Sequence, residues 1–439
     1  MEITTSRLQR TLAQLGPLVS EKSLGDLQAI LATERSAVWD LHLTPVEEVF
    51  SAQERSTLEN MTLEPYGRSG LKRQMVIILK ATRLCNLRCT YCNAWREGPN
   101  QIMEFSVLAK LIREILATQQ VQNVDFVWHG GEVTLLPTSY LKKALWLQQH
   151  YCSPQTTVAN SIQTNATRLT PEWLSFLRDY GFGVGVSIDG PPEIHDKRRV
   201  TKSGRGTWRD VKRGIDLLRE FEIPFGALAV IDECALELGA AAYLRYLVDI
   251  GVTQVALLNA LPPNSADCAG TAAYVPHDRF TGFLRDLFAA WWSTARDAIE
   301  IRELQALVEA VARGTTGLCI FNDNCMGQYL TIDPNGDVSA CDKYVGDPAY
   351  MFGNLRERNL NEMLEQSTTL AAAHAGVAAQ KRRMSACPHY KICFGGCPHD
   401  VRLSEKYRPE WQPDCCGLSE LIDDISQAVS GNVAGAEVS

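Results

Sequence analysis

The sequence lacks three features that would assign it to common classes of protein. It contains no apolar run of about 18 residues, which a membrane-spanning helix would need. Its start, MEITTSRLQR, has no charged segment followed by an apolar core, as a signal peptide would. Acidic residues outnumber basic ones, and the formal net charge is -8. These absences predict a cytoplasmic protein with no membrane and no nucleic-acid partner.

Cysteine, in contrast, is abundant in a composition that is otherwise ordinary. The chain has 439 residues, of which 45% are hydrophobic and 21% charged, typical of a globular protein with two or three structural units. It contains 14 cysteines. In a reducing compartment such residues are more often metal ligands than disulfide partners. We therefore expect metal chemistry.

The first group of cysteines lies in CNLRCTYC, separated by five residues from an apolar run at residues 75–79. It comprises Cys85, Cys89 and Cys92. Three thiolates leave one iron of a four-iron cluster without a protein ligand, and that iron can bind a substrate or a cofactor. A zinc knot is the structural alternative, but zinc takes four ligands in paired CxxC spacing and no matching fourth ligand is nearby.

The CxxxCxxC spacing, with Tyr91 before the last cysteine, resembles that of radical S-adenosylmethionine (SAM) enzymes. The resemblance implies two cofactors, a [4Fe-4S] cluster and SAM, whose amino and carboxylate groups chelate the open iron. One electron then cleaves SAM, and the resulting 5′-deoxyadenosyl radical takes a hydrogen atom from the substrate. It also implies an electron donor such as flavodoxin or ferredoxin.

Short apolar runs alternate with helical patterns after residue 75, which predicts an α/β fold built from repeated βα units. Six units are fewer than the eight of a closed barrel. The resemblance implies a partial (β/α)6 barrel. The expected strands are residues 75–79, 124–128, 157–162, 183–188, 225–230 and 254–258, and the expected helices are residues 106–117, 140–151, 171–180, 208–220, 240–250, 280–298 and 303–312.

Polar residues follow each of the first four expected strands, where the working loops of parallel βα folds lie. Each could instead be an ordinary turn. The resemblance implies that they bind SAM, with Gly130, Gly131 and Glu132 at its amino group and Asn165 in the same site. It places Ser187 and Asp189 at the ribose, and Arg199, or failing it Arg198, at the carboxylate. Val133 replaces the proline of the family motif, which predicts a less rigid turn after Glu132.

A second group of eight cysteines lies near the C-terminus and resembles a SPASM domain, the extension of many peptide-modifying radical SAM enzymes. The resemblance implies one or two auxiliary [4Fe-4S] clusters. Cys319, Cys325, Cys341 and Cys397 would bind the first, and Cys387, Cys393 and the pair Cys415 and Cys416 remain for the second. A zinc-ribbon-like domain is the alternative.

The second auxiliary cluster is in doubt because the family's remaining ligand position is Met384, and a thioether is a poor substitute for a thiolate. Three alternatives follow for this cluster. It has three ligands and an open iron, it takes its fourth ligand from the second cysteine of the pair Cys415 and Cys416, or it is missing. Without Cys152, Cys234 and Cys268, eleven cysteines remain, the number that clusters with three, four and four ligands need. Adjacent cysteines in extended chain point in divergent directions, which argues against double ligation.

Asp342, directly after Cys341, matches the position of the proposed general base of anaerobic sulfatase-maturating enzymes. A carboxylate can accept the proton released as a substrate radical loses an electron to an auxiliary cluster. The alternative is an ordinary turn aspartate.

The resemblance allows several functions. The departures at Val133 and Met384, with the N-terminal extension, favour a maturase that crosslinks or oxidises a residue of a ribosomally made peptide. The alternatives are a sulfatase-maturating enzyme that oxidises Cys or Ser to formylglycine, a small-molecule dehydrogenase, and a non-catalytic electron carrier. In the first two, the partner is a peptide or protein substrate.

Four regions are expected along the chain. Residues 1–70 form a helical extension packed on the main domain, or a substrate-recognition module. Residues 71–312 form the radical SAM barrel, and residues 313–425 form the SPASM domain. The small and polar residues from 426 to 439 predict a disordered tail.

Overall fold

The structure is a computed structural model that describes residues 37–61, 72–92, 101–118, 121–262, 274–314, 316–322, 325–408 and 414–436. Within these ranges ten strands form one sheet in the order β10-β9-β8-β1-β2-β3-β4-β5-β6-β7. The strands are β1 (Lys72–Thr82), β2 (Val121–Gly130), β3 (Thr157–Thr164), β4 (Gly183–Ser187), β5 (Gly226–Ile231), β6 (Gln254–Asn259), β7 (Glu300–Ile301), β8 (Tyr329–Ile332), β9 (Asp337–Ser339) and β10 (Met351–Asn354).

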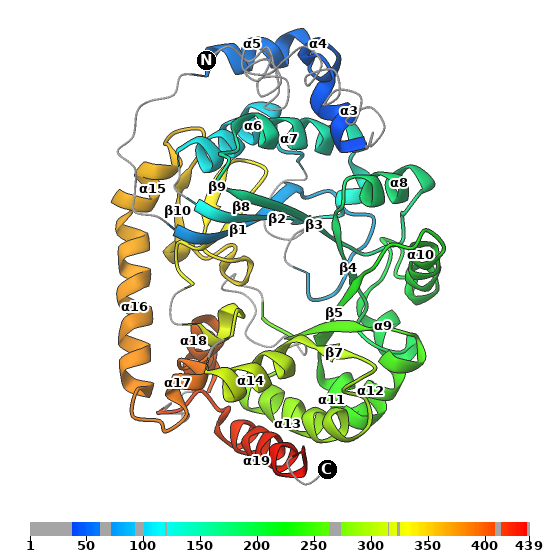
Figure 1. Ribbon diagram of the computed structural model, residues 1–439, viewed down its shortest axis with the longest axis vertical. Helices are drawn as coiled ribbons and strands as arrows, with labels where there is room; N and C mark the ends of the chain where they lie inside the picture. The colour runs from blue at the N-terminus through cyan, green and yellow to red at the C-terminus, as the bar shows by residue number, and fades with distance from the viewer. Residues whose placement is uncertain are drawn as a thin grey trace.

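Helices cover the outside of this curved sheet, as Figure 1 shows. They are α3 (Ala37–Leu43), α4 (Val46–Val49), α5 (Ala52–Asn60), α6 (Phe105–Arg113), α7 (Thr138–Tyr151), α8 (Pro171–Asp179), α9 (Pro192–Arg198), α10 (Trp208–Glu220), α11 (Glu233–Leu238), α12 (Ala240–Asp249), α13 (His277–Thr294), α14 (Arg302–Arg313), α15 (Leu360–Gln366), α16 (Thr368–Met384), α17 (Tyr390–Cys393), α18 (Pro398–Tyr407) and α19 (Ser419–Ala436). In the part of the chain that is described, no helix is both long and apolar enough to cross a membrane.

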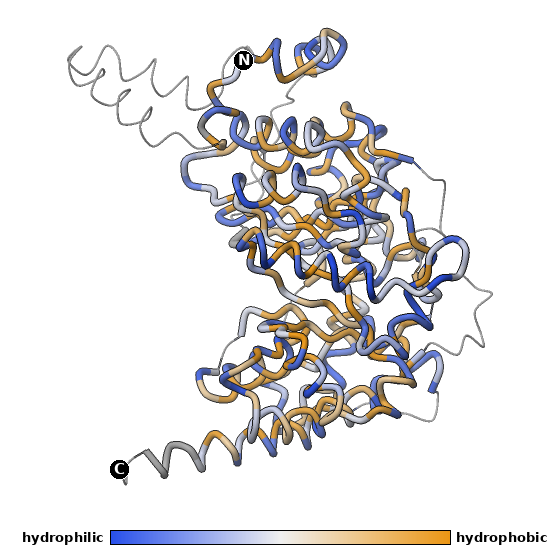
Figure 2. The backbone as a smooth tube through the Cα atoms, turned by 90° about the vertical axis from the view of Figure 1, so that its right-hand side faces the viewer, coloured by the Kyte–Doolittle hydropathy of each residue, from blue (hydrophilic) through white to orange (hydrophobic). Residues whose placement is uncertain are grey.

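The partial barrel that the sequence predicts is confirmed. Strands β1 to β7 pair in parallel with their neighbours, and all six expected strands and the expected helices are present. In β2 the strand forms because buried side chains alternate along it, as Val124, Phe126 and Trp128 show. The surrounding helices alternate between hydrophilic and hydrophobic residues (Figure 2), as expected for helices with one buried face.

The sheet continues into the C-terminal part of the chain. Strand β8 pairs in parallel with β1, where Val76 faces Tyr329, and β8, β9 and β10 form an antiparallel extension. A π-helix, η1 (Glu114–Thr118), adds a polar contact, because the Glu114 carboxylate accepts a 2.6 Å hydrogen bond from the backbone N–H of Leu360. The predicted SPASM region therefore packs beside the first barrel unit. The boundary at residue 312 stays a prediction.

The described part of the N-terminal extension is helical and packs on the outside of the barrel. Phe50 is 1% exposed, and its ring centroid lies 5.4 Å from that of Phe105 and 5.3 Å from that of Trp146. Lys143 of α7 pairs with Glu54 of α5 at 2.6 Å. Helices α3 to α5 are thus fixed to α6 and α7. The rest of the predicted extension, residues 1–36 and 62–70, lies outside the described residues.

The prediction of a disordered tail from residue 426 is wrong for residues 426–436, which continue helix α19. Its earlier turns bury Leu421, Ile422 and Ile425 in the core. Arg285 of α13 adds an ion pair with Asp424 at 2.5 Å. Packing of this apolar face against α13 and α14 extends the helix beyond what its small and polar residues alone predict.

Candidate functional site

A cavity of about 240 Å³ lies at the carboxyl ends of β1 to β6. It brings together residues that lie more than 250 positions apart in the sequence. The first and last of its polar lining residues are Lys80 and Lys343. Of the predicted SAM-site residues, Asp189 does not line it; those that do are Gly130, Gly131, Glu132, Asn165, Ser187 and Arg199.

All three thiols of the first cysteine group line the cavity. The backbone N–H of Leu87 donates to Cys85 Sγ at 3.3 Å, and Asn165 Nδ2 lies 3.9 Å from the same sulfur. Such N–H···S contacts are among the factors that tune iron–sulfur clusters. A cluster donor set therefore faces a space lined by polar groups, and these residues fit a cluster with SAM beside it.

Burial keeps the thiols of Cys85 and Cys89 protonated in the absence of iron. It raises the pKa of Cys85 to about 11 and that of Cys89 to about 12. Iron binds the thiolate, so cluster assembly must release these protons.

Two glycines fix the approach of the β2 loop to the cysteine loop. Gly130 has a φ of +117°, a conformation that other residues rarely adopt. A Cβ on Gly131 would lie 2.0 Å from the carbonyl oxygen of Leu84. Instead, the Gly131 and Glu132 N–H groups donate to the carbonyls of Thr82 and Leu84 at 2.7 and 2.8 Å. These bonds hold the start of the cysteine loop against the second strand.

The Glu132 carboxylate is held by neighbouring donors. Its Oε1 accepts hydrogen bonds from the hydroxyls of Thr134 and Thr164, both at 2.6 Å. Its Oε2 accepts from the backbone N–H of Asn165 at 2.8 Å. Val133 begins a 3-10 turn that Glu132 caps through the N–H of Thr134. The turn expected to be less rigid without proline is therefore fixed by hydrogen bonds.

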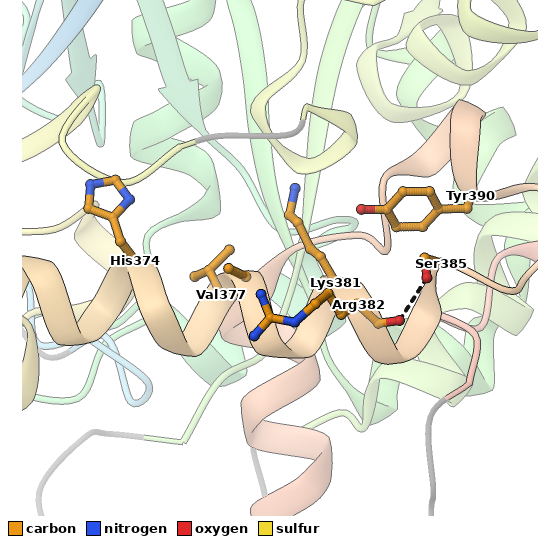
Figure 3. A pocket seen from close by; sticks show the side chains of 7 residues that line it. His374, Val377, Lys381, Arg382, Ser385 and Tyr390 are labelled. Carbon is orange, nitrogen blue, oxygen red and sulfur yellow. Dashed lines mark hydrogen bonds between the residues drawn. The ribbon is translucent and has the colours of Figure 1, made fainter.

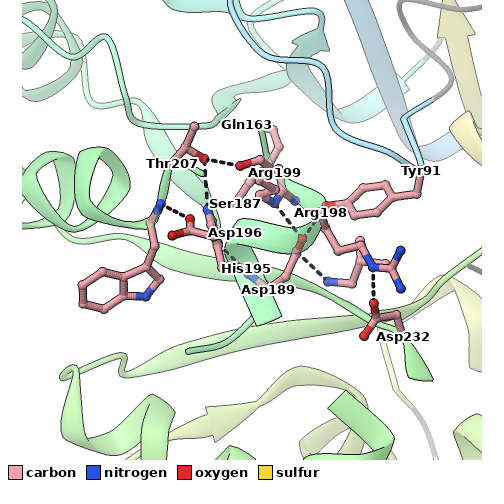
Figure 4. A network of polar contacts seen from close by, with 12 residues as sticks. Tyr91, Gln163, Ser187, Asp189, His195, Asp196, Arg198, Arg199, Thr207 and Asp232 are labelled. Carbon is pink, nitrogen blue, oxygen red and sulfur yellow. Dashed lines mark hydrogen bonds and ion pairs between the residues drawn. The ribbon is translucent and has the colours of Figure 1, made fainter. Parts of the chain in front are cut away.

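Asp189 lies behind the cavity wall, in the network drawn in Figure 4. Its Oδ2 accepts from the Tyr91 hydroxyl at 2.7 Å and from Arg199 Nε at 2.9 Å, and its Oδ1 accepts from the N–H of Val230 at 3.1 Å. This carboxylate orients Arg199 and the cysteine-loop tyrosine. Ser187, by contrast, lines the cavity, and its hydroxyl accepts from Gln163 at 2.9 Å.

Of the two candidate arginines, only Arg199 faces the cavity. Its Nε is bound to Asp189, so the terminal guanidinium nitrogens are the atoms that a carboxylate in the cavity would meet. Its guanidinium carbon lies 5.5 Å from the centre of the Tyr91 ring. Arg198 instead pairs with Asp232 (Figure 4).

Asp342 enters the same cavity from the C-terminal part of the chain. Its Oδ1 lies 2.6 Å from Lys80 Nζ, and its side chain is 38% exposed, so the carboxylate opens into the cavity. Burial opposes its charged form, but the charges of Lys80 and His129 outweigh this effect and lower the pKa of Asp342 to about 2. Lys80 and His129 are register partners on β1 and β2, which explains why both reach this carboxylate.

The four thiols predicted for the first auxiliary cluster lie close enough to interact electrostatically with one another. They are Cys319, Cys325, Cys341 and Cys397. Lys343 Nζ lies 3.8 Å from Cys397 Sγ and 2.8 Å from the Asp400 carboxylate. Because Lys343 also lines the SAM-site cavity, this cluster site borders the cavity. The remaining predicted ligands lie around α17 and before α19.

A second cavity, of about 350 Å³, lies along α16 and contains none of the predicted site residues. Figure 3 shows it between His374, Lys381 and Tyr390. Lys381 Nζ donates to the carbonyl of Asn322 at 2.9 Å, so this side chain ties α16 to the segment after Cys319.

Among the lining residues that the sequence-based site did not include are three basic ones, Lys80, His129 and Lys343. Lys80 could have been found from the sequence, since it is a charged residue directly after an apolar strand run. Lys343 could not, because its contact with the cavity depends on β8 pairing with β1.

Comparison with known proteins agrees with this geometry. The model of the radical SAM superfamily matches residues 79–233, and that of the SPASM iron-sulfur cluster-binding domain matches residues 319–397. The chain belongs to the radical SAM superfamily and carries a SPASM domain. The cofactors are accordingly SAM and [4Fe-4S] clusters, with the predicted auxiliary site in the SPASM domain.

The chain is homologous to anaerobic sulfatase-maturating enzymes. It is 31% identical to a serine-type enzyme from Klebsiella aerogenes, over 78% of this chain and 82% of the relative. A cysteine-type enzyme from Clostridium perfringens is 27% identical, over 73% and 88%. The structure of anSMEcpe with bound AdoMet and Kp18Cys peptide has a TM-score of 0.67 and 24% identity, over 80% of this chain and 99% of that one. These relatives favour the sulfatase-maturating alternative over the crosslinking maturase expected from Val133 and Met384.

Proposed function

We propose that this protein oxidises a serine or cysteine side chain of a peptide or protein substrate to formylglycine. One observation carries the proposal: the Asp342 carboxylate opens into the cavity that contains the three cluster thiols, while the adjacent Cys341 belongs to the auxiliary thiol group. A base and an electron acceptor thus flank the same reaction space.

When bound, SAM and its cluster supply the radical that removes a hydrogen atom from the substrate Cβ. The substrate radical must then lose one electron and one proton to become a carbonyl. An auxiliary cluster held by Cys319, Cys325, Cys341 and Cys397 would supply the electron acceptor, and Asp342 would take the hydroxyl proton of serine, which gives the aldehyde directly. With cysteine, the same loss gives a thioaldehyde, and its hydrolysis releases sulfide and gives the aldehyde.

The surrounding residues support this assignment. Lys80 keeps Asp342 ionised and therefore able to accept a proton. Arg199 offers a guanidinium to the SAM carboxylate, and Asp189 and Tyr91 hold it in place. The named activities of the relatives, serine-type and cysteine-type sulfatase maturation, add support.

The proposal is tested with reconstituted protein, SAM and a chemical reductant under anaerobic conditions. Two sulfatase-type peptides that differ only in serine or cysteine at the target are compared with an alanine control by mass spectrometry. We expect an aldehyde, captured by a hydrazide, from at least one of the two. Formation of 5′-deoxyadenosine with both peptides unchanged would refute sulfatase-type oxidation and direct the search to a dedicated precursor peptide or a small molecule.

A further inference from the structure

Four cysteines gather between α17 and the start of α19. Cys416 Sγ lies 3.4 Å from Cys393 Sγ. The thiols of Cys387 and Cys415 hydrogen-bond to each other, and Cys415 also interacts with Cys416. The chain thus brings together four thiols that the sequence separates by up to 29 positions, Cys387, Cys393, Cys415 and Cys416.

The local backbone directs both members of the adjacent pair into this group. Residues 414, 415 and 417 lie in bends, and Gly417 has a φ of +82°. The expectation that adjacent thiols diverge applies to extended chain, and this segment is not extended. His277 Nε2 lies 2.9 Å from the carbonyl oxygen of Cys416 and fixes the segment against α13.

A glycine makes room for the close approach of Cys416. Gly396 has a φ of +72°, and a Cβ at this position would lie 3.0 Å from the Cβ of Cys416. The Cys416 side chain is 1% exposed. A buried thiol next to those of Cys393 and Cys415, in a loop shaped to admit it, has the placement of a ligand.

Met384 lies beside the same group without contributing a thiolate. It is fully buried at the end of α16, and its Sδ would lie 3.1 Å from a Cβ on Gly395. The methionine therefore occupies core space next to the loop. The cluster site must obtain its fourth thiolate elsewhere, and Cys416 is the thiol in position to supply it.

We propose that Cys387, Cys393, Cys415 and Cys416 bind a second auxiliary four-iron cluster, in which Cys416 takes the place of the ligand missing at Met384. The match to the iron-sulfur cluster-binding domain ends at residue 397, so Cys415 and Cys416 lie beyond it. Within the described ranges, no three His, Cys, Asp or Glu side chains are arranged to chelate a single metal ion. Two of the four thiols, Cys387 and Cys393, lie inside the match to the iron-sulfur cluster-binding domain, which favours a cluster over one zinc ion.

The test counts iron and sulfide in anaerobically reconstituted full-length protein. The background variant Cys85→Ala/Cys89→Ala/Cys92→Ala removes the radical SAM cluster, so about eight irons from two auxiliary clusters should remain. Adding Cys416→Ala should leave about four. Adding Cys152→Ala, as a matched control, should leave about eight, because Cys152 lies at the C-terminal end of α7, where its Sγ donates to the backbone carbonyls of Ser153 and Thr156.

A second pair of variants covers the case in which Cys416→Ala does not fold. Cys416→Ser keeps the size of the side chain, and we expect loss of about four irons or a changed electron paramagnetic resonance spectrum of the reduced protein. Met384→Cys combined with Cys416→Ala should restore the iron, since position 384 borders the same loop.

Three results would overturn the proposal: about four irons in the background variant, one zinc in place of the second cluster, or an unchanged iron content and spectrum in both Cys416 variants. None of these measurements depends on the substrate, so the outcome is independent of the function proposed above.

Discussion

Lys80 Nζ lies 2.6 Å from Asp342 Oδ1 and joins the first barrel strand to the turn that follows Cys341. The contact forms because β8 pairs with β1 and carries the C-terminal part of the chain to the mouth of the barrel. It places an ionised carboxylate beside the cluster thiols, and the first two predictions concern this pair.

Asp342→Asn removes the proposed base without changing the size of the side chain. We expect SAM cleavage to continue while oxidised peptide falls about 100- to 10,000-fold, the usual contribution of a general base. Both products are measured in one chromatographic assay. Asp216→Asn is the control, because this aspartate is exposed on α10 and pairs with Lys212. Equal product from Asp342→Asn and wild type would remove the catalytic role.

Lys80→Met should make peptide oxidation sensitive to acid. Burial raises the pKa of the Asp342 carboxyl, whereas Lys80 helps to lower it to about 2. In wild type this group stays ionised throughout the neutral range. Without the ammonium its pKa must rise, so the base is protonated, and product formation is lost, as the pH falls through the new value.

The measurement for Lys80→Met is the pH profile of peptide oxidation, compared with that of SAM cleavage without peptide. Lys212→Met, which breaks the exposed pair with Asp216, should keep the wild-type profile. A Lys80→Met profile that coincides with wild type would show that the ammonium does not control the base.

Arg199→Ala should weaken SAM binding. Loss of a hydrogen bond to a charged group costs about 1.5 to 3 kcal/mol, which is about a 10- to 100-fold increase in Kd. Equilibrium dialysis of reconstituted protein gives the value. Arg198→Ala is a matched control, since its side chain pairs with Asp232 outside the cavity lining. If both variants bind SAM equally well, the carboxylate is held elsewhere.

Gly131→Ala should expel the radical SAM cluster and spare the auxiliary ones. The added Cβ would lie 2.0 Å from the carbonyl oxygen of Leu84, so the cysteine loop has to move. Iron per chain should fall by about four. Gly282→Ala provides the comparison, because a Cβ there meets nothing within 4 Å. Full iron content in Gly131→Ala would contradict the close packing of these two loops.

Phe50→Ala should detach the N-terminal helices from the barrel. This ring packs against Phe105 and Trp146, and truncation of a buried phenylalanine costs about 3 to 5 kcal/mol. We expect faster proteolysis within residues 37–61 and unchanged SAM cleavage. Leu43→Ala serves as the control, since Leu43 is 38% exposed. Loss of SAM cleavage in Phe50→Ala alone would give these helices a role in the site.

The sequence by itself determined the barrel and the first cluster site. Short apolar runs between helical patterns specify the strands, and the short spacing of Cys85, Cys89 and Cys92 places three thiols in one loop whatever the rest of the chain does. The loops after β1 to β4 then share one edge because parallel strands end on the same side.

Only the tertiary structure decided how distant segments meet. The sequence could not place Asp342 beside Lys80, because this contact depends on strand pairing between β1 and β8. Nor could it orient Cys415 and Cys416, whose thiols converge because Gly417 turns the chain and His277 holds it. The sequence predicts Asp189 at the cavity surface, but the residue lies behind it, because its carboxylate accepts hydrogen bonds from Tyr91 and Arg199. Local periodicity encodes elements, whereas these contacts arise from packing between them.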